Sequence, residues 1–514
     1  MAEVALGRHL ETWYPCERDH RRDLACAAYV VGIQGTGKST LLANLAEQFI
    51  AAGEGVLVID TKGELSDDIA ARTARPERLI YVAPGETDHP SGTRHWTLNP
   101  LAFDRSQPHL QEAAIKNLLA LFDRMDLADL KRMPQLRQML YMLAQLAMGL
   151  PEPTLGDLLR LLADAPLRRR LLANPGLTEA VAAFWRRYDQ LTPKQQDEKA
   201  TTTLPRLNEL LAAPVISRVV SHPRSTIRLA DWLDDGKLVV CNLGAKFDGE
   251  TSRLLGNFLV AAVINAGYAR PTINERPAMR PWRVIVDEFH QLAGEQFAEI
   301  IEQLRKHQVF PVIAHQNLSQ LGDRLTAAAT SCGVRFFLRV SPDDQPQIRR
   351  LFGPVVGDGL TSLPPFQARV QLPNELDVKT LQLPNWWAPH DEGQLNAAKR
   401  AADDDRFTVP ETMVAAASER SSTPSNISSN TPMNEPDAKL SRRRTAKAPA
   451  APTRLLDAFN DTDQETTDDL PRSLDAHPPR RRSGERLAAQ AHADGDRDPD
   501  RDRPHRLLDE FADH

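Results

Sequence analysis

Residues 32–39 read Gly-Ile-Gln-Gly-Thr-Gly-Lys-Ser, the pattern G-x-x-x-x-G-K-[ST], and they limit the folds open to this chain more than any other stretch. An apolar run at 27–31 precedes them and suits a buried strand, and residues 40–45 have helical character. Glycines let successive backbone N–H groups turn inward around an anion, and the following helix adds its positive dipole end. This strand–loop–helix arrangement predicts a loop that holds the phosphates of a nucleoside triphosphate.

The side chains of this loop have separate predicted roles. Lys38 would reach the β- and γ-phosphates, and the hydroxyl of Ser39 would bind Mg²⁺. We therefore predict ATP and Mg²⁺ as the cofactors. The residues predicted to hold the nucleotide are Gly32, Gln34, Gly35, Thr36, Gly37, Lys38, Ser39 and Thr40.

Composition narrows the class of protein. The chain has 514 residues, of which 41% are hydrophobic, so it has room for about two or three compact units with buried cores. The formal charge of −6 gives no overall basic field, so any contact with nucleic acid must be local. Its 4 cysteines form no C-x-x-C pair, which argues against a zinc site or a disulfide framework. The separated cysteines fit a reducing cytoplasm. Because no run approaches about 18 apolar residues, we also expect a soluble protein.

The pattern of apolar residues divides the chain into parts. After an N-terminal extension at 1–24, residues 25–104 alternate short apolar strands with helical stretches, and strands return at 236–390. This alternation predicts an α/β core with a mostly parallel sheet. Residues 105–235 carry apolar side chains at helical spacing and predict an all-helical insertion. Ser, Thr, Pro, Asp and Arg dominate residues 391–514, which predicts a disordered tail.

Polar side chains end two of the later strands. The strand predicted at 282–288 ends in Asp287, placed to hold hydrated Mg²⁺, and Glu288, which would polarise the attacking water. The strand at 309–314 leads to Gln316, whose amide could contact both the γ-phosphate and that water. Taken alone, an Asp-Glu strand end could be a cap or an ion pair, and the glutamine could be an ordinary loop residue. Their combination with a phosphate loop favours a catalytic site.

Further motifs follow the phosphate loop in a fixed order: Val-Ile-Asp-Thr-Lys-Gly-Glu (58–64), Leu-Asn-Pro-Leu (98–101), Val-Asp-Glu-Phe-His (286–290), Leu-Arg-Lys-His (304–307) and Ala-His-Gln-Asn-Leu-Ser-Gln-Leu (314–321). With them the chain resembles the HerA/FtsK class of hexameric DNA motors, and specifically the TraG/TraD-like type IV coupling proteins of conjugation systems. The similarity covers about 25–390. In coupling proteins an all-helical domain is inserted at the place that residues 105–235 occupy.

This resemblance implies a RecA-like P-loop core whose nucleotide lies at the C-terminal ends of the strands. It also implies an ATP-hydrolysing DNA translocase of a conjugative or type IV secretion-like system. In this family the subunits form a ring, expected to be a hexamer, with ATP between subunits. Each subunit donates an arginine finger to its neighbour, and Arg305 stands at the matching place. Arg305 could instead form a surface ion pair, and Arg335 and Arg339 are the reserve candidates.

Two residues of the 58–64 motif have an open interpretation. Asp60 and Lys62 match the family's Asp-x-Lys-Gly motif, but a turn at the end of a strand explains them almost as well. The chain also departs from the family. Coupling proteins usually begin with two transmembrane helices, HerA-type motors carry a β-barrel, and FtsK-type motors end in a winged helix. We expect none of these here, so recruitment to the inner face of the membrane would come from a partner.

Two kinds of sequence feature are candidates for contacts with partners: runs of arginine and a repeat in the tail. Arg168–Arg170 and Arg186–Arg187 could contact DNA, single- or double-stranded, although a solvated helix face explains them at least as well. In the tail, Arg-Leu-Leu-Asp-Ala-Phe-Asn-Asp at 454–461 recurs almost unchanged at 506–513. This repeat predicts a docking motif for a relaxase, a membrane-anchor subunit or the secretion channel, with neutral duplication as the alternative.

Two other classes of function stay open. A motor for protein secretion or assembly would hydrolyse ATP without stimulation by DNA. A nucleotide-switched adaptor would bind DNA-processing partners without translocating. Glu288 and Gln316 argue against the adaptor, because a switch needs no apparatus for hydrolysis.

Overall fold

The computed structural model describes most of the first 414 residues of the chain. Within this part, no helix is long and apolar enough to cross a membrane. The residues described are 8–9 and 24–414, apart from 85–93, 104, 107, 125–131, 174–175, 245–247, 277, 293–300, 302, 374–376, 384–388, 403–407 and 411.

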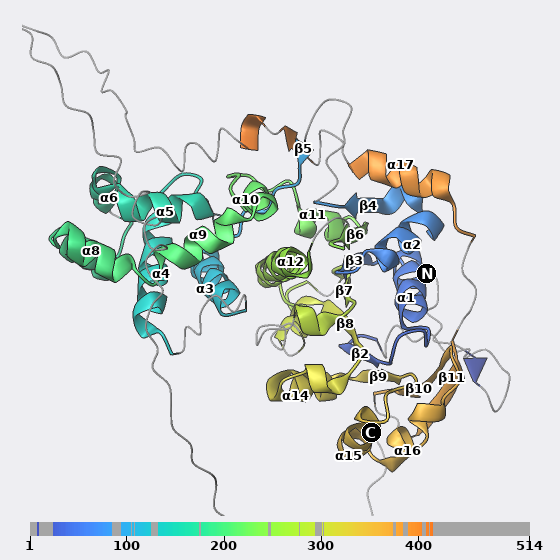
Figure 1. Cartoon of the computed structure of the whole chain (residues 1–514). Coiled ribbons are helices and arrows are strands. Elements are labelled where there is room, and N and C mark those ends of the chain that lie inside the picture. The colour runs from blue at the N-terminus through green and yellow to red at the C-terminus, as the bar shows by residue number, and fades with distance from the viewer. Residues whose placement is uncertain are drawn as a thin grey trace, which may run out of the picture. The chain divides into compact units, whose positions relative to one another are not determined.

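A 10-stranded sheet organises the described residues (Figure 1). In spatial order its strands are β1 (Arg8–His9), β11 (Val378–Gln382), β10 (Gln367–Gln371), β9 (Val334–Phe337), β2 (Ala28–Val31), β8 (Val309–His315), β7 (Trp282–Val286), β3 (Gly55–Asp60), β6 (Leu238–Asn242) and β4 (Leu79–Val82). All pairs from β9 to β4 are parallel, and β10, β11 and β1 are added antiparallel at one edge. The prediction of a mostly parallel sheet is confirmed.

The central strands are apolar because both faces of the sheet are covered. Every residue of β2, β3, β6, β7 and β8 is buried. The C-terminal ends of parallel strands share one edge, so the residues that follow β2, β3, β7 and β8 meet there. In Figure 1, α1 (Lys38–Ala51) and α2 (Glu64–Arg72) lie on one side of these strands, and α11 (Leu229–Asp234) and α12 (Gly249–Ala269) on the other.

Shorter elements complete the core. They are η1 (Pro76–Arg78), η2 (Phe289–Gln291), η3 (Leu304–His307), η4 (Leu318–Gln320), α14 (Asp323–Ser331), α15 (Asp344–Phe352), α16 (Pro354–Gly357) and η5 (Leu360–Ser362).

Every regular element described between residues 105 and 235 is a helix, as the spacing of apolar residues predicts. That these helices form a separate domain stays a prediction. Besides α11 they are α3 (Pro108–Arg124), α4 (Pro134–Ala147), α5 (Leu155–Ala163), α6 (Ala165–Leu172), α7 (Glu179–Asp189), α8 (Pro193–Ala200), α9 (Leu204–Ala212) and α10 (Pro214–Val220).

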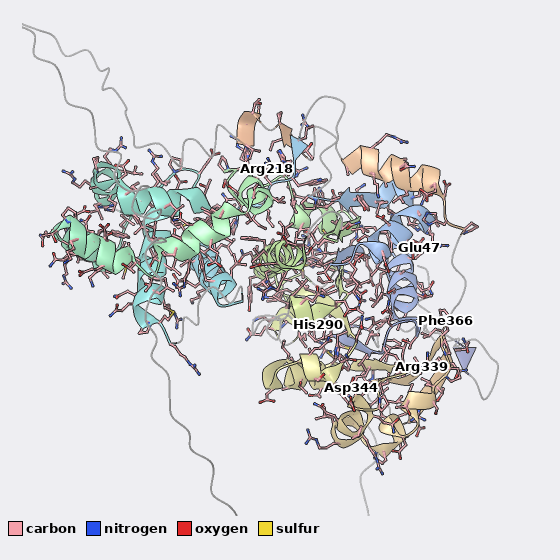
Figure 2. The ribbon with its side chains drawn as sticks, in the orientation of Figure 1. Glu47, Arg218, His290, Arg339, Asp344 and Phe366 are labelled. Carbon is pink, nitrogen blue, oxygen red and sulfur yellow. The ribbon has the colours of Figure 1, made fainter. Side chains whose placement is uncertain are left out.

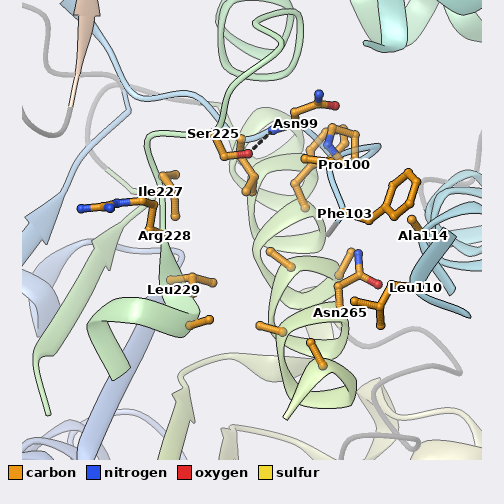
Figure 3. A pocket seen from close by; sticks show the side chains of 18 of the residues that line it. Asn99, Pro100, Phe103, Leu110, Ala114, Ser225, Ile227, Arg228, Leu229 and Asn265 are labelled. Carbon is orange, nitrogen blue, oxygen red and sulfur yellow. Dashed lines mark hydrogen bonds between the residues drawn. The ribbon is translucent and has the colours of Figure 1, made fainter. Parts of the chain in front are cut away.

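The two chain segments that flank α3–α10 are hydrogen-bonded to each other. The Thr226 hydroxyl accepts from the backbone N–H of Thr97 at 2.9 Å, and the Thr97 hydroxyl accepts from that of Thr226 at 3.0 Å. The Asn99 amide donates to the carbonyls of Pro153 and Pro223 at 2.7 and 2.9 Å. The Ser225 hydroxyl accepts from the backbone N–H of Asn99 at 2.9 Å, the contact drawn in Figure 3. Beside it lies an apolar cavity of about 600 Å³ lined by residues of α12, α3 and both segments. The Leu-Asn-Pro-Leu motif therefore ties the ends of the helical segment together.

The predicted start of the disordered tail, residue 391, is wrong. Residues Glu392–Ala402 form α17, which packs on α2 and β4, and the Gln394 amide donates to the carbonyls of Ala70 and Thr73 at 2.9 and 3.0 Å. Strand β12 (Val409–Pro410) pairs antiparallel with β5 (Arg94–His95). Composition averaged over the whole tail hides this short helix, of which only Leu395 and Ala402 are buried. Both copies of the repeat, 454–461 and 506–513, lie outside the described residues.

Candidate active site

The loop between β2 and α1 is held by its own backbone geometry and by one aromatic ring. Gly35 and Gly37 adopt left-handed conformations, with φ of 76° and 98°. A Cβ at Gly37 would also lie 2.7 Å from the ring of Phe366. The Thr36 hydroxyl donates to the Ile33 carbonyl at 2.7 Å and braces the loop from within. This is the conformation that the glycines of a phosphate-binding loop permit.

A cavity of about 470 Å³ lies at the C-terminal edge of the parallel strands, beside the start of α1. Gly32 and Thr36 do not line it, and Thr36 is buried beneath the loop. The predicted site residues that line the cavity are Gln34, Gly35, Gly37, Lys38, Ser39, Thr40, Asp287, Glu288 and Gln316. Other lining residues include Asp60, Lys62, Glu64 and Phe366.

Lys38 connects the loop to the carboxylates that follow β7. Its Nζ lies 3.2 Å from Oε1 of Glu288 and 3.6 Å from Oδ1 of Asp287. The Lys38 side chain is only 7% exposed, so little water screens these charges. Asp287 also accepts a hydrogen bond from the backbone N–H of Glu288 at 2.9 Å, which fixes the Asp287 carboxylate against the backbone of Glu288.

The two oxygens of the Glu288 carboxylate differ in the hydrogen bonds that they accept. Oε1 accepts from Gln316 at 2.5 Å and contacts the ammonium groups of Lys62 and Lys38 at 2.6 and 3.2 Å. Oε2 is buried and accepts no hydrogen bond from any residue that the structure describes. Its nearest ring nitrogen is Nδ1 of His290, at 3.5 Å (Figure 2 labels this histidine). Glu288 has a φ of 49°, a left-handed conformation that non-glycine residues seldom adopt outside functional sites.

The site keeps Glu288 ionised. Burial opposes ionisation, but Lys38, Lys62 and the Gln316 amide outweigh it and hold the pKa of Glu288 below its usual value. Burial raises the pKa of Asp287, and Lys38 offsets this only in part. Burial lowers the pKa of His290, so this ring is neutral near pH 7. A buried, ionised carboxylate with one unpartnered oxygen can accept a proton.

Gln316 is positioned by its neighbour in the chain, His315. Nδ1 of His315 lies 3.0 Å from the Asn317 carbonyl and must donate to it, which leaves Nε2 to accept from the Tyr29 hydroxyl at 2.7 Å. Burial lowers the pKa of His315 to about 3 and raises that of Tyr29 well above its usual value, so both stay neutral. The pair locks the end of β8 to β2 and so fixes the point from which Gln316 enters the cavity.

The sequence leaves two interpretations of Asp60 and Lys62 open, a structural turn or a part of the site, and the structure supports the first for Asp60 and the second for Lys62. The Asp60 carboxylate accepts from the backbone N–H groups of Lys62 at 2.9 Å and Ser66 at 2.8 Å, so it shapes the turn between β3 and α2. The Lys62 side chain leaves this turn and reaches Glu288.

Comparison with known proteins places this fold. No protein-family model matches the chain, and no functionally curated protein matches it. The bacterial conjugative coupling protein TrwB in complex with sulphate aligns with a TM-score of 0.55 at 17% identity, over 76% of this chain and 92% of the TrwBdeltaN70 chain in that structure. TrwB with a non-hydrolysable ATP analogue gives 0.54 at 18% identity, over 77% and 92%. TrwB with ADP and Mg²⁺ gives 0.52 at 17% identity, over 73% and 89%.

This chain has the fold of a conjugative coupling protein.

Within the coupling-protein fold, Arg305 lies away from the cavity. It is exposed on η3, which leads into the N-terminal end of β8, and its charge acts on Cys26, which precedes β2. Its side chain forms no hydrogen bond or ion pair with the residues that the structure describes. Arg335 is engaged elsewhere, because it donates to Gln371 at 2.8 Å. The carbonyl of Arg339 accepts from the phosphate loop.

The arginines of the helical segment separate into two groups. Arg168 is buried, donates to Asp189 at 2.8 Å and to the Leu161 carbonyl at 2.7 Å, and therefore holds α5, α6 and α7 together. Arg169–Arg170 and Arg186–Arg187 are exposed. Of the two arginine runs, these four side chains are therefore the ones that a large ligand such as DNA could reach, whereas Arg168 is buried.

Phe366 is a cavity residue that the sequence did not indicate. It adopts a φ of 61°, and its backbone N–H donates to the Thr36 carbonyl at 2.9 Å. A positive φ at a bulky residue and a contact between distant segments leave no local sequence pattern.

Proposed function

We propose that this chain is an ATPase that binds ATP and Mg²⁺ in the cavity beside α1, with Glu288 as the general base. The observation that carries this proposal is the Glu288 carboxylate, whose Oε1 is held by three donors while Oε2 is buried without a hydrogen bond from the described residues. Such a buried atom calls for a water or a ligand. The fold is shared with TrwB, which has been solved with an ATP analogue and with ADP and Mg²⁺.

The cavity supplies a residue for each task of hydrolysis. Lys38 and the N–H groups at the start of α1 would hold the phosphates. Glu288 would accept the proton of the attacking water at Oε2. Gln316, already bonded to Glu288, would orient the same water and contact the γ-phosphate.

The donor set also fits Mg²⁺. Ser39 and Asp287 both line the cavity and carry a hydroxyl and a carboxylate, and hard oxygen ligands supplemented by water are what Mg²⁺ prefers. Burial raises the pKa of Asp287, and a divalent cation would relieve the cost of its charge. Bound there, Mg²⁺ would neutralise charge on the phosphate oxygens.

A substitution that removes only the base tests this function. Glu288→Gln keeps the shape of the side chain, so we expect ATP affinity within about twofold of wild type and hydrolysis slower by about 10²-fold or more. Glu77→Gln, an exposed carboxylate on η1, is the control and should hydrolyse ATP at the wild-type rate. Hydrolysis by Glu288→Gln at a rate near that of wild type would contradict the assignment.

The finer proposal is a DNA-translocating coupling ATPase of a conjugative or type IV secretion-like system. The subunits would form a hexameric ring with ATP between neighbours, and Arg305 would reach the γ-phosphate of the adjacent subunit. Its exposure and its distance from its own cavity suit a residue that acts on another subunit. Arg169–Arg170 and Arg186–Arg187 would contribute phosphate contacts to DNA. Recruitment by a relaxase, a membrane anchor or a secretion channel would act through the repeats at 454–461 and 506–513.

A further inference from the structure

Lys62 approaches the proposed base more closely than the lysine of the phosphate loop does. Its Nζ lies 2.6 Å from Oε1 of Glu288, against 3.2 Å for Lys38. The two lysines come from different elements, because Lys38 begins α1 and Lys62 lies in the turn between β3 and α2. Their surroundings differ as well, since the Lys62 side chain is 45% exposed and that of Lys38 is 7% exposed.

The turn that carries Lys62 has little freedom. Its backbone N–H is held by the Asp60 carboxylate at 2.9 Å. The next residue, Gly63, has a φ of 91°, and a Cβ there would lie 2.6 Å from Oδ1 of Asn242. From the facing segment, a Cβ on Gly244 would lie 2.0 Å from the carbonyl carbon of Lys62. A backbone packed this closely fixes the position from which the lysine extends.

The contacts of Oε1 suggest a division of labour between the two lysines. A lysine that serves the β- and γ-phosphates cannot also serve as the main partner of Glu288. Lys62 and Gln316 donate hydrogen bonds to Oε1 of Glu288 from outside the phosphate loop. They can therefore hold the carboxylate while the Lys38 ammonium binds the phosphates. With Oε1 fixed in this way, Oε2 keeps its direction.

An ordinary surface ion pair is the alternative for Lys62. Exposed ion pairs contribute little to stability and do not fix the geometry of their side chains. The acidic partner here is not exposed, because the Glu288 side chain is 2% exposed and has a strained backbone conformation. A cation held against a buried carboxylate restricts that carboxylate far more than a solvated pair does.

We propose that Lys62 is a positioning residue for the attack on ATP: it holds Oε1 of Glu288 so that Oε2 faces the water, while Lys38 serves the phosphates. This inference rests on the proposed ATPase function. Lys62 touches neither the water nor the phosphates in this scheme and acts only through Glu288. Its loss should therefore lower kcat and leave ATP affinity nearly unchanged.

The test measures kcat, KM and the affinity for a fluorescent ATP analogue in matched variants. Lys62→Met should lower kcat about 10- to 100-fold with the affinity within about twofold of wild type. Lys62→Arg keeps a cation and should restore most of that loss. Lys116→Met removes an exposed lysine that pairs with Glu112 on α3, and should behave as wild type. If Lys62→Met lowers the melting temperature by more than a few degrees, Lys62→Gln takes its place.

The possible results are distinguishable. An unaltered kcat in Lys62→Met, or an affinity that falls in step with kcat, overturns the inference while wild-type hydrolysis upholds the proposed function. A loss that Lys62→Arg does not relieve also overturns it, because the charge is then not what matters. A wild-type protein that binds ATP without hydrolysing it overturns the proposed function and this inference with it.

Discussion

At the scale of single residues, the site depends on backbone conformations that few side chains can adopt. Gly37 has a φ of 98° and lies against Phe366, which itself has a φ of 61°. The two segments are also joined by the hydrogen bond from Phe366 to the Thr36 carbonyl. Strain in one segment is thus held in place by packing against the other, as is common at functional sites.

Gly37→Ala should abolish nucleotide binding, because the new Cβ meets the Phe366 ring at 2.7 Å in addition to its unfavourable φ. Gly53→Ala is the matched control, since Gly53 has a φ of 84° but nothing within 4 Å of a Cβ. We expect the control to lose about 1 kcal/mol of stability and to keep its ATP affinity. Titration with a fluorescent nucleotide and thermal unfolding measure both effects. Equal affinities in the two variants would show that the contact with Phe366 is unimportant.

His315 makes the folded state sensitive to acid. Burial lowers its pKa to about 3, whereas an unfolded chain protonates histidine near about 6.5. The unfolded state therefore binds more protons below about pH 6.5, and the stability from neutral His315 is lost as the pH falls towards 3.

We expect the free energy of unfolding to fall by about 2 kcal/mol more in wild type than in His315→Gln between pH 7 and pH 5. Glutamine keeps an acceptor for Tyr29 but has no titrating proton. Urea unfolding at both pH values measures the difference. Parallel losses in the two proteins would mean that His315 is protonated in the folded state.

The side chains that line the cavity could be predicted because the chemistry expected of them is tied to residue type and to strand ends. Lys38, Asp287, Glu288 and Gln316 follow strands whose apolar runs are legible in the sequence, and the structure gathers them in one cavity. The contact of Lys62 with Glu288 could not be derived, because it depends on a turn fixed by Asp60 and Asn242.

At the scale of elements, β7 carries a charge inside the core. Arg283 donates to Glu54 at 2.5 Å, and its guanidinium lies 4.4 Å from the ring of Phe49 and 4.8 Å from that of Phe310. The Arg283 side chain is 2% exposed and the Glu54 side chain 8%. Removing one partner of such a pair leaves the other charge buried and alone.

Arg283→Met should therefore lower the free energy of unfolding by about 3 kcal/mol. The control is Arg349→Met, which breaks an exposed pair: Arg349 lies 3.1 Å from Asp358, and the two side chains are 59% and 58% exposed. That variant should lose less than about 1 kcal/mol. Urea unfolding measures both, and similar losses would contradict a buried role for Arg283.

The strands could be predicted from sequence patterns, whereas helix α17 could not. The strands were predictable because continuous apolar runs, such as β2 and residues 56–59 of β3, are typical of strands with both faces covered. Helix α17 was not, because two buried side chains in eleven residues do not change the polar average of the tail. The Gln394 amide anchors α17 on α2 by donating to the Ala70 carbonyl, and no local sequence pattern predicts this contact.

At the scale of the whole molecule, the proposed role of Arg305 as an arginine finger requires more than one subunit. The cavity is lined by residues of the loop between β2 and α1, by Glu288 and by Gln316, but Arg305 lies elsewhere in the same chain. We expect Arg305→Ala and Lys38→Ala each to be nearly inactive. Mixed in equal amounts, they should recover about a quarter of the wild-type ATPase rate, because a quarter of random interfaces join an intact Lys38 to an intact Arg305.

The control mixes Lys38→Ala with Glu288→Gln. These two residues contact each other within one chain, so no mixed interface can supply both. Recovery in the control as well, or none in the first mixture, would contradict a finger that acts between subunits.

The most direct test of the account is steady-state ATP hydrolysis by the full chain, with and without single- and double-stranded DNA, for wild type and Glu288→Gln. A DNA-translocating ATPase predicts hydrolysis that rises several-fold with one form of DNA and is lost in the variant. Wild-type hydrolysis that is indifferent to both forms of DNA would contradict it and favour a motor that acts on protein. Nucleotide binding without hydrolysis under any condition would contradict the ATPase itself.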